Sequence, residues 1–261
     1  MSTPLRTPVL PELVAGDGEV TATFAPDARS WAGVHGGLVV GALLDVAAQA
    51  TGRVALAVTA HLHAAVDPGP ASLTARAVST GRAVTSVTAA LEQGRRRATA
   101  SVVLVAPDEP ARHWEAGHRD VATVPAPEEA DRLTGMEEVV PVARYFDIRP
   151  VREARPLAGG EVPELTAWVR LLPGAAYRAA VAPVLLDALA PSLYAVGTAP
   201  LSIPTVEFTV HLTPSVPVDE WLLVDQRTTW STGSFCVDEA DLVDRTGRLI
   251  AQARQLRRIL G

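Results

Sequence analysis

Two apolar segments of this sequence each carry a single acidic residue, and in both the acid follows a Leu-Leu pair. The first segment runs from Ser30 to Gly52 and contains Asp45, and the second runs from Ala180 to Gly197 and contains Asp187. A carboxylate held beside a water molecule can take a proton from it as a general base. The sequence therefore offers two candidate bases, and the residues around them must decide between the two.

A His-Gly-Gly run, His35 to Gly37, lies directly before the first apolar stretch. Glycine lets a ligand approach the backbone closely. Backbone N–H groups at the start of a helix can also stabilise developing negative charge. We therefore expect His35, Gly36 and Gly37 to form a loop that positions substrate or binds an oxyanion.

Other reactive residue types lack the pattern that their chemistry needs. His61 and His63 have no third residue at metal-ligand spacing, so no metal site is predicted. The chain contains no G-x-S-x-G motif, and its glycines match no dinucleotide or phosphate-loop motif. Cys236 lies in an apolar strand pattern without a basic neighbour and is interpreted as a small core residue. No cofactor is implied.

The periodicity of apolar residues predicts the elements that must position these groups. Apolar residues on nearly all sides of a helical pattern predict a buried helix after His35, and the segment around Asp187 has the same character. Alternating or β-branched runs bounded by turn residues predict strands. The expected strands cover residues 53–66, 71–80, 83–93, 97–106, 144–151, 164–172, 203–212, 220–230, 233–244 and 247–260.

Length and composition exclude several classes of protein. The 261 residues can form one large domain or two small ones with a real core. A net charge of −6 without a basic stripe argues against nucleic-acid binding. A single cysteine fits a reducing compartment. The first thirty residues lack a signal-peptide pattern, and no apolar run approaches the roughly 20 residues of a membrane span. We expect a cytoplasmic protein that does not bind membranes.

The two halves of the chain repeat the same elements in the same order. Leu43–Asp45 aligns with Leu185–Asp187, and the turn glycine Gly94 aligns with Gly247. Such a repeat predicts a pseudo-dimer of two units, each with a helix and about four antiparallel strands. We assign the first unit to residues 1–106 and the second, with the expected active-site residues, to 142–261. A linker rich in proline and acids, with at most one helical turn, covers 107–141.

The segment "HGGLVVGALLD" and the repeated pattern of a buried helix with an antiparallel sheet resemble the hotdog fold. More narrowly, "RYFDIRPV", "TAWVRL", "EWLL" and "DRTGRLIAQARQ" are similar to the second half of the double-hotdog acyl-CoA thioesterases, the thioesterase II family. The resemblance implies an α+β double hotdog that hydrolyses an acyl-CoA or related thioester in fatty-acid metabolism. It implies no cofactor, an acyl chain in an apolar tunnel between the halves, and possible homo-oligomers of pseudo-dimers.

The same resemblance implies three site residues in the second half. The family holds and activates water with an Asp on the second helix, a Thr at the start of the next strand and a Gln on the last strand. These fall on Asp187, Thr205 and Gln255. The loop from the other half falls on His35–Gly37, where His35 replaces the aromatic residue that is more frequent in thioesterase II proteins.

Comparison of the two copies supports the second as the working one. The first-half counterparts of these three residues are Asp45, Ala57 and Val102, so only the acid is kept in the first copy. Asp45 remains the alternative acid, because an HGG run followed by a helix acid is closer to single-hotdog thioesterases.

Each of the three residues also has an ordinary structural interpretation. Asp187 can pair with Arg178 instead of holding water. Strand alternation places Thr205 on the face opposite the apolar one. Gln255 can lie where the last strand reaches solvent, as the neighbouring Arg257 suggests.

Two other functions stay open. A non-catalytic acyl-CoA-binding protein would share the fold without turnover. A hotdog hydratase or dehydratase would use an Asp/His pair on a helix, and the sequence contains no such helical spacing.

Overall fold

The computed structural model describes residues 9–16, 19–107, 120–173, 176–214 and 217–260. Its first half contains β1 (Leu13–Ala15), β2 (Val20–Phe24), α1 (Gly36–Thr51), β3 (Val54–Leu62), β4 (Gly69–Thr80), β5 (Val84–Gln93) and β6 (Arg95–Val105). Its second half contains β7 (Phe146–Pro150), β8 (Glu164–Leu171), α2 (Val181–Leu186), β9 (Thr205–Leu212), β10 (Leu222–Thr232), β11 (Phe235–Asp244) and β12 (Leu249–Arg258). Short 3-10 helices lie at Pro26–Ala28, Pro141–Tyr145 and Ser192–Ala195.

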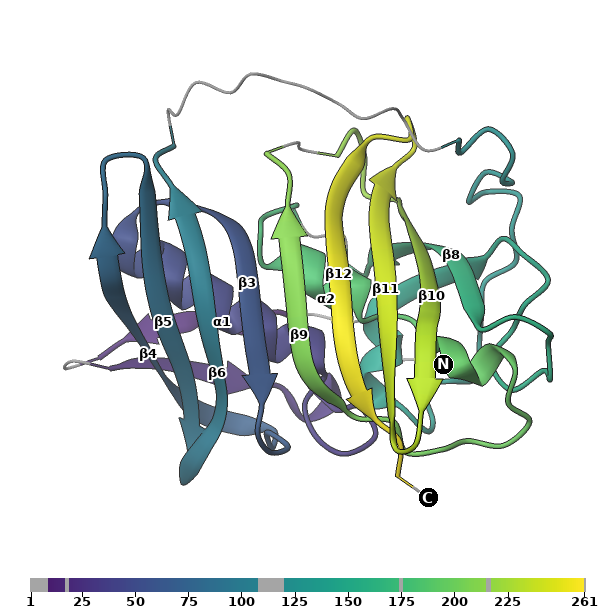
Figure 1. Ribbon diagram of the computed structural model, residues 1–261, viewed down its shortest axis with the longest axis horizontal. Helices are drawn as coiled ribbons and strands as arrows, with labels where there is room; N and C mark the ends of the chain where they lie inside the picture. Colours follow the sequence, from purple (N-terminus) through teal and green to yellow (C-terminus); the bar gives the residue numbers. More distant parts are fainter. Residues whose placement is uncertain (1–8, 17–18, 108–119, 174–175, 215–216, 261) are drawn as a thin grey trace.

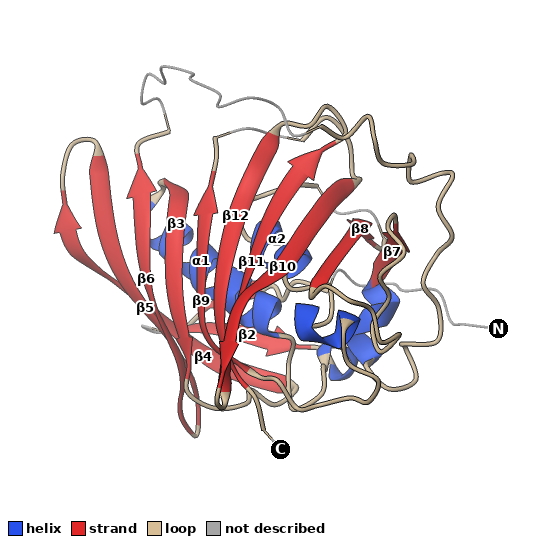
Figure 2. Ribbon diagram, turned by 45° about the vertical axis from the view of Figure 1, so that its right-hand side comes forward, coloured by secondary structure: helices blue, strands red, loops and turns tan. Residues whose placement is uncertain are grey.

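All strands join one antiparallel sheet whose order repeats about its centre. The order is β1-β2-β4-β5-β6-β3-β9-β12-β11-β10-β8-β7, so each half adds its strands outward from the β3–β9 pair in the same sequence. The sheet curves around α1 and α2, which lie on its concave side (Figures 1 and 2). The fold is the expected double hotdog, and every expected strand is present. The sequence patterns missed β1 and β2, which extend the first half of the sheet.

Helix α1 is buried along most of its length and packs closely on α2. Ten of its residues, from Gly37 to Ala47, are buried. A Cβ atom on Gly37 would lie 2.4 Å from the carbonyl oxygen of Pro183, and one on Gly41 would lie 2.7 Å from that of Ala180. Only glycine permits these approaches, so the glycines of α1 set the distance between the helices.

Helix α2 is much shorter than the long helix expected around Asp187. It spans six residues, and Asp187 caps its C-terminus with φ −106° and ψ 9°. Pro191 has no N–H to donate to the carbonyl of Asp187 four residues earlier, so the helix cannot continue through this point. That carbonyl instead accepts a hydrogen bond from His35 Nε2 at 2.7 Å.

A β-bulge occupies corresponding positions in the two central strands. The extra residue is Leu56 in β3 and Val206 in β9, because the pairing with β6 or β12 shifts there. The residue before the bulge is Ala55 in β3 and Thr205 in β9. The structural counterpart of Thr205 is therefore Ala55, and the expected alignment with Ala57 is wrong by two residues.

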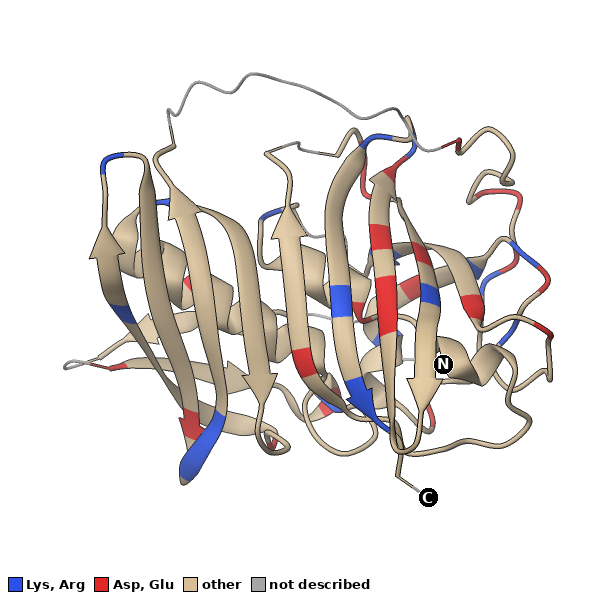
Figure 3. Ribbon diagram, in the orientation of Figure 1, with Lys and Arg blue, Asp and Glu red and all other residues tan. Residues whose placement is uncertain are grey.

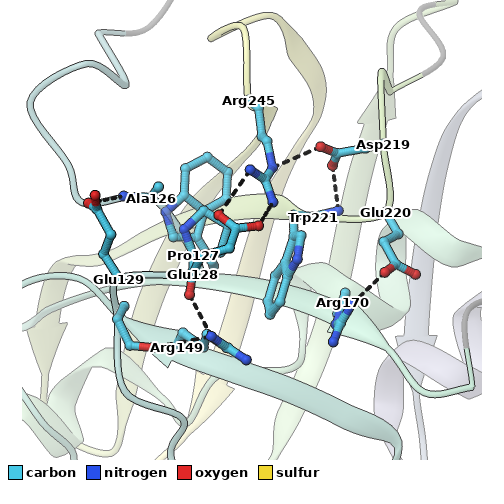
Figure 4. Close-up of polar contacts among 12 residues, drawn as sticks. Ala126, Pro127, Glu128, Glu129, Arg149, Arg170, Asp219, Glu220, Trp221 and Arg245 are labelled. Atoms are coloured by element: carbon cyan, nitrogen blue, oxygen red, sulfur yellow. Dashed lines mark hydrogen bonds and ion pairs between the residues drawn. The ribbon is translucent and has the colours of Figure 1, made fainter.

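The described part of the segment between the halves, residues 120–140, lies against the edge of the second half, and we call it the strap. Trp168 Nε1 donates to the carbonyl of Pro125 at 2.8 Å, and Arg149 Nη1 to that of Pro127 at 2.7 Å. Arg245 pairs with Glu128 (Figure 4). These contacts hold the strap in place. Residues 108–119 of the expected linker lie outside the described residues.

Charged residues gather on the strands of the second half. Figure 3 shows Asp, Glu and Arg on β9 to β12, whereas β3 carries none. In β11 and β12, Asp238 and Arg257 lie on the buried side of the sheet. Among the described residues, no helix is long and apolar enough to cross a bilayer.

Candidate active site

Asp187 lies at the C-terminus of α2 with four donors around its carboxylate. Gly37 N donates to Oδ2 at 2.9 Å, and Gln255 Nε2 donates to Oδ1 at 3.2 Å. Two longer contacts complete the set, His35 Nε2 to Oδ2 at 3.4 Å and Arg257 Nη2 to Oδ1 at 3.5 Å. The side chain is only 10% exposed. Donors from both halves of the chain therefore fix its orientation.

Two further expected site residues lie nearby, because Gln255 contacts Asp187 and Thr205 contacts Gln255. Thr205 Oγ1 donates to Gln255 Oε1 at 2.7 Å, and the amide nitrogen of Gln255 faces Asp187. Gln255 is 2% exposed, so it does not mark a strand reaching solvent. The three side chains form one connected set on α2, β9 and β12.

The bulge at Val206 explains why Thr205 joins this set. Strand alternation predicted Thr205 on the face opposite Phe208, which is wrong. A bulge adds one residue to one strand and shifts the alternation on one side of it. Thr205 pairs with Arg257 across β9 and β12, and Phe208 pairs with Gln255. The hydroxyl of Thr205 consequently points to the buried face.

The His35–Gly37 loop reaches Asp187 from the first half of the chain. His35 is 5% exposed, and within the described part of the chain its Nε2 contacts only oxygen atoms of Asp187, so Nε2 carries the proton. Its Nδ1 is buried and has no partner among the described residues. A Cβ on Gly36 would lie 3.0 Å from Asp187 Oδ2, so a side chain there would crowd the carboxylate.

The loop glycines differ in what their N–H groups do. The N–H of Gly37 is used by Asp187 Oδ2. The N–H of Gly36, at the first position of α1, donates to none of the described residues. Of the two expected oxyanion donors, Gly36 is the one whose N–H has no acceptor in the described part of the chain.

Sequence reasoning missed Arg257 and Asp238. Arg257 was interpreted as a sign of solvent exposure, but its side chain is 5% exposed and its Nε lies 2.8 Å from Asp238 Oδ2. Asp238 also accepts from Thr228 Oγ1 at 2.6 Å. The signal for this pair was an acid among the inward-facing residues of β11, between Cys236 and Ala240.

Asp45 has none of these neighbours. Its carboxylate pairs with Arg178, which was the alternative partner considered for Asp187. Burial raises the pKa of Asp45, and the hydrogen bond from Arg178 partly offsets this. The cavity described next includes Asp187 in its wall but not Asp45.

A cavity of about 750 Å³ lies beside Asp187. His35, Gly36, Thr205 and Arg257 line it near the carboxylate, whereas Gln255 is not part of the wall formed by the described residues. The rest of the wall is mainly apolar and includes Val39, Leu133, Met136, Val140, Phe146, Leu165 and Leu189. Trp31, Leu201 and Leu260 also line it and are exposed, which indicates where it opens.

Of the remaining sequence signals, His63 lies in the wall of the cavity. Cys236 is fully buried, and burial raises the pKa of its thiol to about 11. His61 and His63 stack on each other at 6.4 Å between ring centroids on the surface. No group of three His, Cys, Asp or Glu residues in the described part of the chain is placed to hold a metal ion.

Two family models match successive halves of the chain. Residues 25–106 match the model of the acyl-CoA thioesterase N-terminal domain, and residues 118–259 match that of the C-terminal domain. An uncharacterized protein of Mycobacterium tuberculosis is 30% identical over 250 residues, covering 85% of this chain and 84% of the relative.

Solved structures show the same fold. A hotdog-fold protein of unknown function from Alicyclobacillus acidocaldarius has a TM-score of 0.86 at 22% identity, covering 97% of both chains. The acyl-CoA thioesterase II of Mycobacterium marinum has a TM-score of 0.71 at 17% identity, covering 95% of this chain and 96% of its own.

Proposed function

Because this chain belongs to the acyl-CoA thioesterase family, we propose that it hydrolyses an acyl-CoA, or a related acyl thioester, to a free acid and a thiol. The main support is the position of Asp187. Its carboxylate is held by donors from both halves and stands in the wall of an apolar cavity of about 750 Å³. Such a volume is typical of small-molecule sites, which span roughly 300–1,000 Å³.

Asp187 acts as the general base in this proposal. The hydrogen bonds from Gly37 and Gln255 fill two of the about four acceptor positions of the carboxylate. The longer contacts leave room for a water molecule, because His35 Nε2 donates to the Asp187 carbonyl and Arg257 Nη2 makes no hydrogen bond with the described residues. The water adds to the thioester carbonyl carbon while its proton passes to Asp187. The carbon–sulfur bond then breaks, and the leaving thiolate takes up the proton.

Gly36 supplies the oxyanion donor. Its backbone N–H has no acceptor among the residues that the structure describes, and Gly36 lies at the N-terminus of the 16-residue helix α1 and borders the cavity beside Asp187. Donors aimed at developing negative charge are usually a large term in catalysis. Gly37 instead holds the base, so the two glycines have separate roles.

The apolar wall receives the acyl chain, and the exposed residues Trp31 and Leu260 lie along the path of the thiol arm. Burying the chain contributes roughly 0.8 kcal/mol per methylene. The polar atoms of Asp187 and Gly36 then meet the carbonyl at the start of the chain.

The test is thiol release from a panel of acyl-CoAs, from acetyl to palmitoyl and including one aromatic acyl group. Wild type is compared with Asp187→Asn and with its matched control Asp45→Asn, the same change at the corresponding acid of the first copy. We expect Asp187→Asn to reduce kcat by about 10²–10⁴-fold, as loss of a general base does. Asp45→Asn should keep wild-type turnover.

Full activity of Asp187→Asn would contradict the assigned base. Loss of activity in Asp45→Asn alone would move the site to the first copy. Wild-type protein that binds acyl-CoA without releasing thiol would favour the non-catalytic acyl-binding protein.

One observation favours a second candidate, a hydratase or dehydratase acting on an acyl thioester. His35 and Asp187 face each other from different halves of the chain, with His35 Nε2 3.4 Å from Asp187 Oδ2. The absence of an Asp/His pair within one helix therefore does not exclude this chemistry. Consumption of a trans-2-enoyl-CoA without thiol release, abolished by His35→Ala, would establish it.

A further inference from the structure

A buried arginine, Arg257, connects the site residues to a second carboxylate. Its Nε lies 2.8 Å from Asp238 Oδ2, its Nη1 donates to Thr205 Oγ1 at 2.9 Å, and its Nη2 lies 3.5 Å from Asp187 Oδ1. We propose that Arg257 is a positioning residue that fixes the direction of the hydrogen bonds running through Thr205 and Gln255 to Asp187. This inference rests on the proposed hydrolase function.

The direction follows from what each group can donate. A guanidinium only donates, so Thr205 Oγ1 must accept from Arg257. The single hydroxyl proton of Thr205 is then directed to Gln255 Oε1 at 2.7 Å. With its oxygen occupied, Gln255 presents its amide nitrogen to Asp187 Oδ1 at 3.2 Å. The reversed amide would place oxygen against the carboxylate.

This order changes the part that Thr205 plays. Its only proton is used by Gln255, so it does not donate to the attacking water. Gln255 is not in the cavity wall formed by the described residues, so it acts on the carboxylate and not on the substrate. The series Arg257, Thr205, Gln255 therefore orients the base, Asp187.

Asp238 keeps Arg257 in place. Its side chain is 2% exposed, and it accepts hydrogen bonds from Thr228 Oγ1 at 2.6 Å and from Ser192 N at 3.4 Å. A buried charge requires a paired and hydrogen-bonded partner. The ion pair thus fixes the guanidinium from which the series begins.

The first copy shows that these polar residues form one unit. The strand pairings give the structural counterparts of these residues. Matched β-bulges occur in β3 and β9, and matched register shifts occur in the β5–β6 and β11–β12 pairings. Thr205, Asp238, Gln255 and Arg257 correspond to Ala55, Val87, Val102 and Leu104. All four polar residues are replaced together by apolar ones, as expected if none is useful alone.

The test combines Arg257→Lys and Thr205→Val in a double-mutant cycle of thiol release. Lysine keeps the charge beside Asp238 but lacks the planar fork that bridges two acceptors. We expect each change to lower kcat by about 10²-fold with KM unchanged, because the base is misplaced while the apolar wall that receives the acyl chain stays intact. The double variant should lose no more than either single variant. Thr205→Ser, which keeps the hydroxyl, should recover turnover.

Arg254→Lys is the matched control. Arg254 lies on the same strand with its side chain 57% exposed, so this variant should keep wild-type kcat. Losses in Arg257→Lys and Thr205→Val that multiply would show independent roles and overturn the proposal. Full activity of Arg257→Lys, or an effect on KM alone, would overturn it as well.

Two further measurements keep the proposal testable if Arg257→Lys or Thr205→Val fails to fold, or if the wild-type protein hydrolyses no thioester. Asp238→Val combined with Arg257→Leu installs the first-copy residues, and replacing a buried ion pair by apolar residues often preserves stability. This protein should fold and still lose kcat; full kcat would overturn the proposal. NMR of the Gln255 side-chain amide reads its orientation without turnover, and an amide signal unchanged by Arg257→Lys would overturn it even if no thioester is hydrolysed.

Discussion

At the scale of single residues, Asp45 and Asp187 occupy corresponding positions but have different neighbours. Asp187 meets the N–H of Gly37 and the amide of Gln255, whereas Asp45 meets the charged side chain of Arg178. Burial is the largest influence on Asp45 and raises its pKa above the ordinary value of 3.8. Burial therefore disfavours the charged form of Asp45, the acid of the first copy.

This environment of Asp45 predicts a pH dependence of stability. A raised pKa means that the folded state binds the proton more tightly than the unfolded state, so stability falls as pH rises from 3.8 through the raised value. Asp45→Asn removes this decline. We expect the variant to be at least as stable as wild type at pH 7, with a flatter dependence of its free energy of unfolding on pH.

Urea unfolding of both proteins between pH 4 and pH 7 measures the difference. A variant clearly less stable than wild type at pH 7 would contradict this prediction. It would show that the ion pair with Arg178 outweighs the burial of the carboxylate.

The residues at the site differ in how far sequence alone could identify them. The resemblance and the repeat together single out Asp187 and Gln255, because a Gln replaces Val102 on an otherwise apolar strand face. Arg257 replaces Leu104 in the same comparison, but a charged residue near the end of a strand is typical of solvent exposure, and its neutralising partner Asp238 lies on another strand. A buried charge pair becomes visible only when the pairing of β11 with β12 is known.

At the scale of elements, strand periodicity predicted the sheet well but could not show its irregularities. The bulge at Val206 leaves no mark in the residue pattern, yet it turns Thr205 into the site. The early end of α2 could be predicted more readily from the sequence, because Pro191 follows Asp187 by four residues. Both irregularities lie at the site, where local rules are most often broken.

The position of the strap predicts that this segment limits the length of the acyl chain. Leu133, Met136 and Val140 of this segment line the cavity, and the contacts of Glu128 with Arg245 hold the segment against the sheet. Met136→Ala enlarges the apolar space. We expect the best substrate to become longer, with kcat/KM gaining about fourfold for each extra buried methylene, equivalent to roughly 0.8 kcal/mol.

Thiol release across the acyl-CoA series measures this shift. Met136→Leu is the control, since it keeps the side-chain volume and should keep the wild-type optimum. An unchanged optimum in Met136→Ala would mean that the strap does not bound the acyl chain.

At the scale of the whole molecule, the site and the fold depend on the same contacts between the two halves. The β3–β9 pair makes the sheet continuous, and Thr59 Oγ1 donates across it to Thr209 Oγ1 at 3.0 Å, because the hydroxyl proton of Thr209 goes to the Glu207 carboxylate. Gly37 joins α1 to the base of the second half. Neither half can separate without exposing the buried face of a helix and dismantling the site.

We therefore predict that the two halves unfold together. With Trp31 replaced by Phe, the fluorescence change of the buried Trp168 and Trp221 should report the second half. Amide hydrogen exchange of β5 and β6 should report the first, with one shared transition in urea. Gly41→Ala places a Cβ 2.7 Å from the carbonyl oxygen of Ala180, so overpacking should destabilise the protein by about 1–3 kcal/mol. Both probes should then shift to lower urea equally.

Gly197→Ala is the control for this prediction, because the nearest atom to its Cβ lies at an ordinary 3.5 Å. Its transition should stay close to that of wild type. If Gly41→Ala moved the exchange of β5 and β6 while the tryptophan transition stayed in place, the halves would be separate folding units. The site could then assemble only after both had folded, and its loss would precede global unfolding.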